Sequence, residues 1–233
     1  LLPLSLQSVG RRAFADTDIS SVTIPASLTS IGEFAFSGCQ NLSSIKVDSA
    51  NTVYASVGGV LFNKEKSVLL QYPCAKRGAF YDVPSGVTTI SGDAFASASN
   101  LLGVTIPDGV DSIGDRAFSN CNRLESVSIH QSISDWGSYT FSNCYNLKQV
   151  ILEDGLTAIG EYAFAWSGIT KITLPASMKT IASGAFYETE LTSIALPEGV
   201  VRLGENAFAY CDSLETVSLP QSLTYIGPEA FSG

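Results

Sequence analysis

Residues 28 to 39 read Leu28-Thr29-Ser30-Ile31-Gly32-Glu33-Phe34-Ala35-Phe36-Ser37-Gly38-Cys39, and parts of this segment recur along the whole chain. Its most regular element is the Ala-Phe pair, in which Thr140 replaces alanine once. The phenylalanine of the pair stands at positions 14, 36, 95, 118, 141, 164, 186, 208 and 231. Successive steps are therefore 22, 59, 23, 23, 23, 22, 22 and 23 residues. A fixed period of this length indicates a repeat architecture, in which each unit packs against its neighbours.

A short alternating segment opens each repeat. In Val22-Thr23-Ile24-Pro25, apolar and polar residues alternate, two of the residues are β-branched aliphatics, and the proline ends the segment. Stacked at about 4.8 Å per coil, such segments predict a parallel β-sheet on one face of a solenoid. The equivalent strands are expected to end near Val47, Val83, Ile106, Ile129, Leu152, Leu174, Leu196 and Leu219.

The return segment of each coil follows that strand. Leu28 and Ile31 are expected to point inward, Gly32 to permit a tight or left-handed backbone, and Phe36 to fill the far side of the coil. The pattern leaves open a single helical turn, a short second strand or an irregular loop, and its length predicts little α-helix. Stacked phenylalanines, each contributing about 2 kcal/mol through burial, are expected to be a main source of stability.

The step of 59 residues marks an insertion at residues 50–80. Two apolar runs, residues 58–62 and 67–73, flank the polar residues 63–66 and predict a β-hairpin. We therefore expect residues 1–233 to form a single leucine-rich-repeat-like solenoid that carries one β-hairpin insertion. Neither end shows a capping repeat, so we also expect the chain to be a fragment of a longer array.

The repeat resembles the BspA-like class of bacterial leucine-rich repeats, and the segment from Asn51 to Pro73 resembles an insert common in that class. The resemblance covers essentially the whole chain. Proteins of this class are typically secreted or displayed on host-associated bacteria, and some are associated with adhesion to host matrix proteins or other cells. The resemblance thus implies an extracellular or cell-surface location and a protein ligand, such as a host matrix or cell-surface protein. It transfers no binding residue to a numbered position.

The charge of the chain narrows the kind of partner. Thirteen Lys and Arg against 22 Asp and Glu give a net charge of −9, which argues against a broad nucleic-acid or anionic-membrane surface. Residues 101–233 carry fifteen acidic and six basic side chains, so the excess lies there. Either a solvated acidic face or a site for a basic partner explains it. Apolar runs are too short to predict a membrane-spanning helix.

No catalytic constellation is visible. His130 is the only histidine, which excludes a multi-histidine metal site, and it stands where other repeats place the strand-ending proline. No phosphate loop or nucleophile elbow occurs. The sequence therefore predicts no enzyme, no cofactor and no metal site. Cys39, Cys121, Cys144 and Cys211 follow the repeat phenylalanine by three residues, which favours free core thiols over a disulfide or a metal site.

Two surfaces are candidates for partner binding. Along one edge, Trp166 and Tyr210 each follow a repeat phenylalanine by two residues, so we expect both to be partly exposed, with packing against neighbouring loops as the alternative. The outward positions of the sheet form a small, hydroxyl-rich face. The candidates on that face are Ser21, Thr23, Lys46, Thr105, Ser128, Ile151, Lys171 and Thr173. The predicted function is a protein-binding module, including an adhesin role, with a passive spacer or stalk as the alternative.

Overall fold

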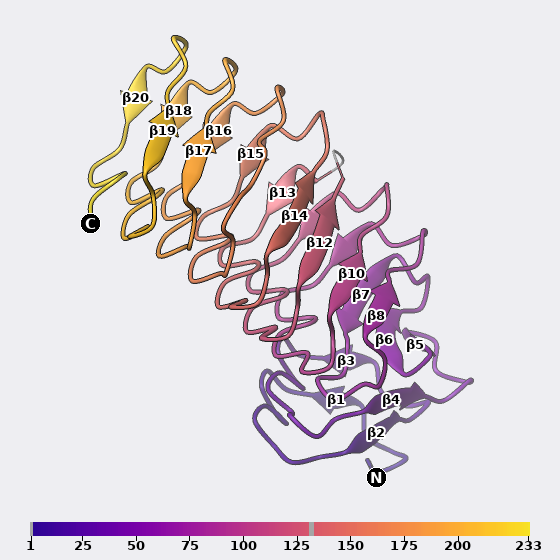
Figure 1. Ribbon diagram of the computed structural model, residues 1–233. Coiled ribbons are helices and arrows are strands. Elements are labelled where there is room, and N and C mark those ends of the chain that lie inside the picture. Colours follow the sequence, from indigo (N-terminus) through magenta and orange to yellow (C-terminus); the bar gives the residue numbers. More distant parts are fainter. Residues whose placement is uncertain (1, 131–132) are drawn as a thin grey trace.

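The computed structural model describes residues 2–130 and 133–233 as a curved stack of coils built from short strands and turns (Figure 1). Most coils contribute one strand to a first ladder and a shorter strand to a second, and a tight turn at the repeat phenylalanine closes each coil. Within this described part, no helix is long and apolar enough to cross a bilayer. The fold is a β-solenoid of parallel sheets, as the sequence predicts.

The first ladder contains the strands that open each repeat. Its parallel register places Thr105 opposite Ser128 and Ser128 opposite Ile151. The ladder is divided into three sheets, β2-β4, β8-β10-β12-β14 and β17-β19. The strands are β2 (Ser21–Ile24), β4 (Ser44–Val47), β8 (Phe80–Asp82), β10 (Gly103–Thr105), β12 (Ser126–Ile129), β14 (Gln149–Leu152), β17 (Ser193–Ala195) and β19 (Thr216–Ser218).

The expected strand ending near Leu174 is wrong. Residues 171–174 form no strand, so β14 and β17 are not joined. Three steps of the repeat are 22 residues long because the turn after the repeat phenylalanine is one residue shorter, and two of them belong to the coils of residues 171–174 and of β17, which do not pair with the coil before them. At the turn before residues 171–174, a Cβ on Gly168 would lie 2.1 Å from the carbonyl oxygen of Tyr145.

The second ladder shows that the return segment contains a short second strand rather than a helical turn. After β3, a Cβ on Gly32 would lie 2.4 Å from the backbone nitrogen of Arg11, so close approach between coils, and not a left-handed backbone, accounts for this glycine. The strands are β1 (Ser8–Val9), β3 (Ser30–Ile31), β9 (Thr89–Ile90), β11 (Ser112–Ile113), β13 (Asp135–Trp136), β15 (Ala158–Ile159), β16 (Thr180–Ile181), β18 (Arg202–Leu203) and β20 (Tyr225–Ile226).

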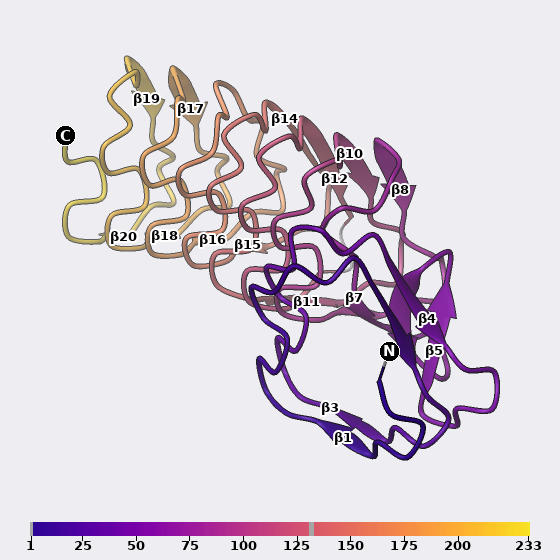
Figure 2. The same cartoon turned by 90° about the horizontal axis from the view of Figure 1, so that it is seen from below.

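Three antiparallel strands lie within residues 50–80. They are β5 (Tyr54–Val57), β6 (Val60–Asn63) and β7 (Val68–Gln71), and β6-β7 is the hairpin expected from the sequence. β7 then pairs in parallel with β9 and so joins the second ladder. On the other side, the Ile45 nitrogen of β4 donates to the Gly59 oxygen at 2.8 Å, and Figure 2 shows β4 and β5 close together. The insertion therefore connects the first two coils to the rest.

The core consists of two clusters of buried apolar side chains. The smaller cluster belongs to the first coils, and the larger one runs from the insertion toward the C-terminus. Strand β6 separates them, because Val60 and Phe62 belong to the larger cluster and Leu61 to the smaller. Because successive side chains of a strand point to opposite faces, β6 contributes side chains to both clusters and lies between them.

The phenylalanine column is divided at the same place. Phe14 and Phe36 stack on each other with ring centroids 5.6 Å apart. A separate column begins at Tyr72 of the insertion, passes to Phe95 and continues to Phe231 with centroid distances from 4.5 to 5.6 Å. One aromatic side chain from the insertion therefore takes the first place in the larger column.

The cysteines are buried and unpaired, as the sequence predicts. The four that follow a repeat phenylalanine donate their thiol hydrogens to the carbonyl oxygen of the phenylalanine one coil earlier, at sulfur to oxygen distances of 2.9 to 3.2 Å. These cysteines link successive coils inside the core. They are Cys39, Cys121, Cys144 and Cys211.

Candidate functional site

The candidate residues on the strand face do not form one continuous surface. The breaks in the first ladder and the insertion divide them into three groups. All of them are exposed except Ser128, which is half-buried. The first group is Ser21, Thr23 and Lys46, the second is Thr105, Ser128 and Ile151, and the third is Lys171 and Thr173.

A groove of about 570 Å³ joins the second and third groups. It lies where residues 171–174 leave the ladder, and Ile151, Lys171 and Thr173 line it. Ile151 is 49% exposed and is the main apolar surface in the groove. Four further aliphatic side chains line the groove, namely Val150, Leu152, Ile172 and Leu174, and they are buried or half-buried.

A second cleft, of about 480 Å³, lies where the first coils meet the later ones. Ile31, Phe34 and Tyr54 form part of its wall on one side, and Ile90 and Asp115 part of the wall on the other. The Phe34 ring is already covered by two guanidinium groups, those of Arg11 and Arg116, at 5.4 and 5.3 Å from the ring centroid. Two arginine side chains of the same chain therefore already cover the Phe34 ring, which leaves little of it for a ligand.

His130 lies between two carboxylates at the end of β12. Its Nδ1 is 2.9 Å from Oδ1 of Asp108 and 2.8 Å from Oε2 of Glu153. The three residues come from consecutive coils, since His130 and Glu153 both occupy the strand-ending position. The Asp108 side chain is 85% exposed, so we interpret the group as a polar cluster at the surface.

Five aromatic rings form a continuous strip along the edge at the repeat turns, which we call the aromatic edge. Tyr210 is 46% exposed, and the other four are half-buried. None of the five belongs to the buried apolar clusters. The aromatic edge consists of Tyr139, Tyr162, Trp166, Tyr187 and Tyr210.

The rings of the aromatic edge contact one another in sequence. Tyr139 and Tyr162 stack with centroids 4.8 Å apart, and each is stacked with Trp166 at 6.5 and 6.4 Å. Trp166 meets Tyr187 edge to face at 5.3 Å, and Tyr187 meets Tyr210 in the same manner at 5.3 Å. Such offset and edge-to-face arrangements are the favourable geometries for aromatic pairs. The strip therefore spans four consecutive coils without interruption.

The local backbone explains why these side chains reach the surface. Tyr139 and Tyr162 precede their repeat phenylalanines by two residues, and Trp166 and Tyr210 follow theirs by two. All four adopt left-handed backbone conformations, with φ between 50° and 60°. Bulky residues rarely adopt this conformation, which costs of order 1 kcal/mol or more each. Less costly residues occupy the same places in other coils, including Gly38, Asn120 and Asn143.

A glycine in the next coil leaves space for the Tyr162 ring. Gly184 stands two residues before Phe186, the register position that Tyr162 holds one coil earlier. A Cβ on Gly184 would lie 2.2 Å from the Tyr162 ring. Because no side chain is present there, the Tyr162 ring lies over the next coil, where it meets Tyr187 at 6.1 Å.

Carboxylates lie near two tyrosines of the aromatic edge, Tyr162 and Tyr187. Burial raises the pKa of Tyr162, and the nearby Tyr139, Glu205 and Glu161 raise it further. Partial burial also raises the pKa of Tyr187, and the nearby Glu188, Tyr210 and Tyr162 raise it further. These shifts have the direction expected for phenols beside negative charge.

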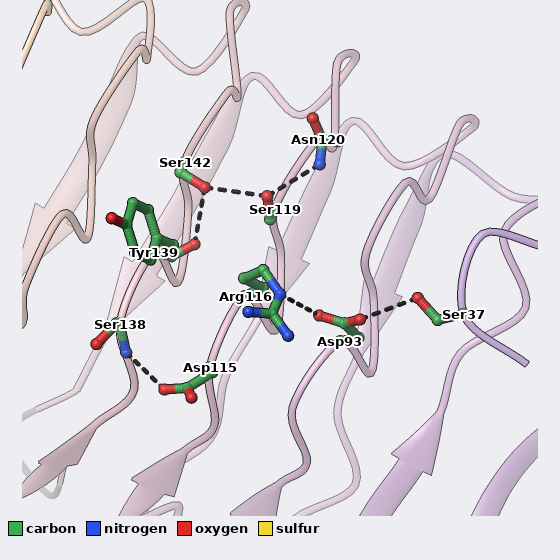
Figure 3. A network of polar contacts seen from close by, with 9 residues as sticks. All are labelled: Ser37, Asp93, Asp115, Arg116, Ser119, Asn120, Ser138, Tyr139 and Ser142. Carbon is green, nitrogen blue, oxygen red and sulfur yellow. Dashed lines mark hydrogen bonds and ion pairs between the residues drawn. The ribbon is translucent and has the colours of Figure 1, made fainter. Parts of the chain in front are cut away.

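The same edge is polar on the N-terminal side of Tyr139 (Figure 3). Asp93 accepts a hydrogen bond from Ser37 at 2.9 Å and pairs with the Arg116 guanidinium at 3.0 Å. Closer to the aromatic edge, the hydroxyl of Ser142 lies 3.0 Å from that of Ser119 and donates to the Tyr139 carbonyl oxygen at 3.0 Å. In this polar part the side chains form hydrogen bonds and ion pairs within the chain, whereas the aromatic edge presents ring faces to the surface.

The sequence identified Trp166 and Tyr210 and missed the three tyrosines between and beside them. Tyr139, Tyr162 and Tyr187 occupy two other register positions, where most coils place charged or small residues. The available signal was compositional, because six aromatic residues other than the repeat phenylalanines lie between residues 136 and 187. Only the turn geometry shows that residues before and after the phenylalanine face the same edge.

Solved structures similar to this chain are bacterial leucine-rich repeat proteins. One from Bacteroides ovatus is 30% identical, with a TM-score of 0.68, and covers 100% of this chain and 63% of that one. A leucine rich cell surface protein from Faecalibacterium prausnitzii is 27% identical with a TM-score of 0.66, covering 98% of this chain and 53% of that one. A third, from Eubacterium ventriosum, is 24% identical with a TM-score of 0.77, covering 97% and 62%. This chain thus spans 53 to 63% of the length of these proteins.

No curated protein sequence matches the chain. The family description that matches is the BspA type leucine rich repeat region, in six copies over residues 2–68, 79–183 and 138–233. Repeats of this family and fold are typically modules without enzymatic activity. With nearly its whole length matched, the chain belongs to the BspA-type leucine-rich repeat family.

Proposed function

We propose that this chain is a protein-binding module of a bacterial cell-surface protein, and that it contacts its partner through the aromatic edge. The observation that carries the proposal is the row of five partly exposed rings that the buried core does not use. Tyrosine and tryptophan are enriched at protein interfaces because they bury large areas with little loss of side-chain freedom.

The backbone of the aromatic edge supports the same proposal. Four bulky side chains stand at left-handed positions, two of them at a register where other coils carry glycine or asparagine. The ring contacts offset this conformational cost only in part, since the rings stay partly exposed. A partner that covers the rings would supply the missing burial energy.

The cell-surface location and an adhesin role are parts of this proposal. The similar protein from Faecalibacterium prausnitzii is described as a cell surface protein, which supports an extracellular location. A host matrix or cell-surface protein is the partner class that we propose. The groove with Ile151, Lys171 and Thr173 is the second candidate surface, because the strand face is hollowed there.

The test is quantitative binding of the purified chain to immobilised host matrix proteins. An edge variant (Trp166→Ala, Tyr187→Ala, Tyr210→Ala) is compared with a strand-face variant (Lys46→Glu, Thr105→Glu, Lys171→Glu). We expect saturable binding that weakens at least tenfold in the edge variant and stays within twofold in the strand-face variant. The opposite pattern would assign binding to the strand face. Absence of binding to every matrix protein would favour the spacer or stalk function.

A further inference from the structure

The aromatic edge lies in the acidic part of the chain. Residues 101–233 carry fifteen acidic and six basic side chains. Three of these carboxylates are exposed side chains on the turns that carry the rings. Glu161 precedes Tyr162, Glu188 follows Tyr187, and the Glu205 backbone oxygen accepts a hydrogen bond at 2.8 Å from Gly184, over which the Tyr162 ring lies. A partner that covers the edge must therefore enter a negative field.

Elsewhere in the chain, arginine side chains lie over partly exposed aromatic rings. Arg11 and Arg116 lie over Phe34, and the Arg202 guanidinium lies 4.0 Å above the ring centroid of Tyr225. Among residues 2–130 and 133–233, these are the cation-π contacts, and none involves a ring of the aromatic edge. Arginine stacks on Tyr and Trp faces while its remaining N–H groups bind carboxylates. The aromatic edge presents both kinds of acceptor without a guanidinium of its own.

The dimensions of the strip fit an extended chain. From Tyr139 to Tyr210 the edge crosses four coils, and consecutive ring contacts lie 4.8 to 6.4 Å apart. In an extended peptide, side chains on one face recur about every 6.6 Å. At about 4.8 Å per coil, the three intervals between the four coils span about 14 Å, the length of about four to five extended residues, which present two or three side chains on one face.

We infer that the aromatic edge binds an extended, arginine-rich segment of a partner protein, with alternate guanidinium groups stacked on its rings and paired with Glu161, Glu188 and Glu205. This inference rests on the proposed function and adds to it the chemistry of the partner. Guanidinium stacking supplies affinity at the rings, and the carboxylates select positive charge over neutral segments of the same shape.

The experiment measures fluorescence anisotropy of a labelled seven-residue peptide with arginine at every second position. Its matched control has citrulline at those positions, which keeps the shape and removes the charge. We expect the arginine peptide to bind at least tenfold more tightly than the citrulline peptide. We also expect its affinity to fall at least fivefold between 50 and 300 mM salt, because exposed charges are screened. Equal affinity of the two peptides, or no saturable binding, would overturn the inference.

Two charge-matched variants locate the site. The edge variant Glu161→Gln, Glu188→Gln, Glu205→Gln and the control variant Asp154→Asn, Glu198→Gln, Glu215→Gln both remove three exposed carboxylates. We expect the edge variant to bind the arginine peptide at least fivefold more weakly and the control variant within twofold of the unsubstituted chain. Equal losses would show a response to net charge alone and would contradict a specific site.

The same variants separate this inference from the proposed function. Binding to a matrix protein that is lost on substitution of Trp166, Tyr187 and Tyr210, but kept when the three glutamates become glutamine, would leave the proposed function in place. It would overturn the arginine-rich partner and favour a neutral segment or a glycan. Matrix binding that is indifferent to the rings would overturn both.

Discussion

The first coils and the later coils follow the same repeat pattern but form different structures. In residues 2–47, two stacked phenylalanines and a small cluster of apolar side chains form a core closed by Leu61 of the insertion. From Tyr72 onward, the rings form one unbroken column in a single larger cluster. Figure 1 shows β2 and β4 running across the direction of β10, β12 and β14. The repeat therefore specifies the coil, whereas the insertion decides how far one core extends.

The largest expected effect is the removal of a ring from the middle of the longer column. Phe118→Ala removes a fully buried ring with stacked neighbours on both sides, and we expect the free energy of unfolding to fall by about 3–5 kcal/mol. Phe14→Ala is the matched change in the first coils, where the ring is half-buried and has one stacked neighbour. We expect about 2 kcal/mol there. Urea unfolding of both variants provides the measurement, and equal losses would contradict the division of the column.

Strand β6 allows a sharper test of the two cores. Leu61→Ala opens a cavity in the smaller cluster, and Phe62→Ala opens one in the larger. We expect Leu61→Ala to lower amide protection in residues 9–47 by about 2–4 kcal/mol and to leave residues 95–208 unchanged. Phe62→Ala should have the reverse pattern. Native-state hydrogen exchange resolves the two regions, and uniform loss of protection in either variant would show a single cooperative unit.

A smaller effect on the free energy of unfolding is expected at alkaline pH, from titratable groups close to the boundary between the two cores. Burial raises the pKa of Tyr72, Cys74 and Tyr81 to about 12. Because the unfolded groups lose their protons first, their contribution to stability is fully present below about pH 9 and is lost as the pH rises toward 12. For Cys74 we expect a loss of about 1 kcal/mol at pH 10. Unfolding measured from pH 8 to 11 should give a shallower slope in Cys74→Ala than in the unsubstituted chain. An unchanged slope would refute the assignment.

The periodicity of the sequence was sufficient to predict the structure of a coil, but it was insufficient to predict where the strand face is interrupted. The repeat phenylalanines, the opening strands and the β6-β7 hairpin follow from local patterns with fixed spacing. The interruption at residues 171–174 coincides with a turn that is one residue shorter. That difference is visible in the 22-residue steps, but the steps alone do not show where the ladder is interrupted. The ladder of Thr105, Ser128 and Ile151 therefore ends where a continuous sheet was expected.

The aromatic edge shows a similar limit. Trp166 and Tyr210 share one register position and could be predicted together from alignment of the repeats. Tyr162 and Tyr187 stand at two other positions, and they meet because Gly184 leaves space above its coil. Contacts that depend on the absence of a side chain in the next coil are not encoded in the pattern of any single repeat.

The left-handed residues that flank each repeat phenylalanine have an evolutionary consequence. In different coils these places carry Arg12, Asp16, Phe34, Asn206 or Glu229, so the turn accepts cationic, anionic, aromatic and amide side chains in one backbone conformation. Variation there leaves the buried phenylalanine and the strand register untouched. A lineage can therefore acquire a new specificity by exchanging turn residues coil by coil, while the scaffold that presents them keeps its fold.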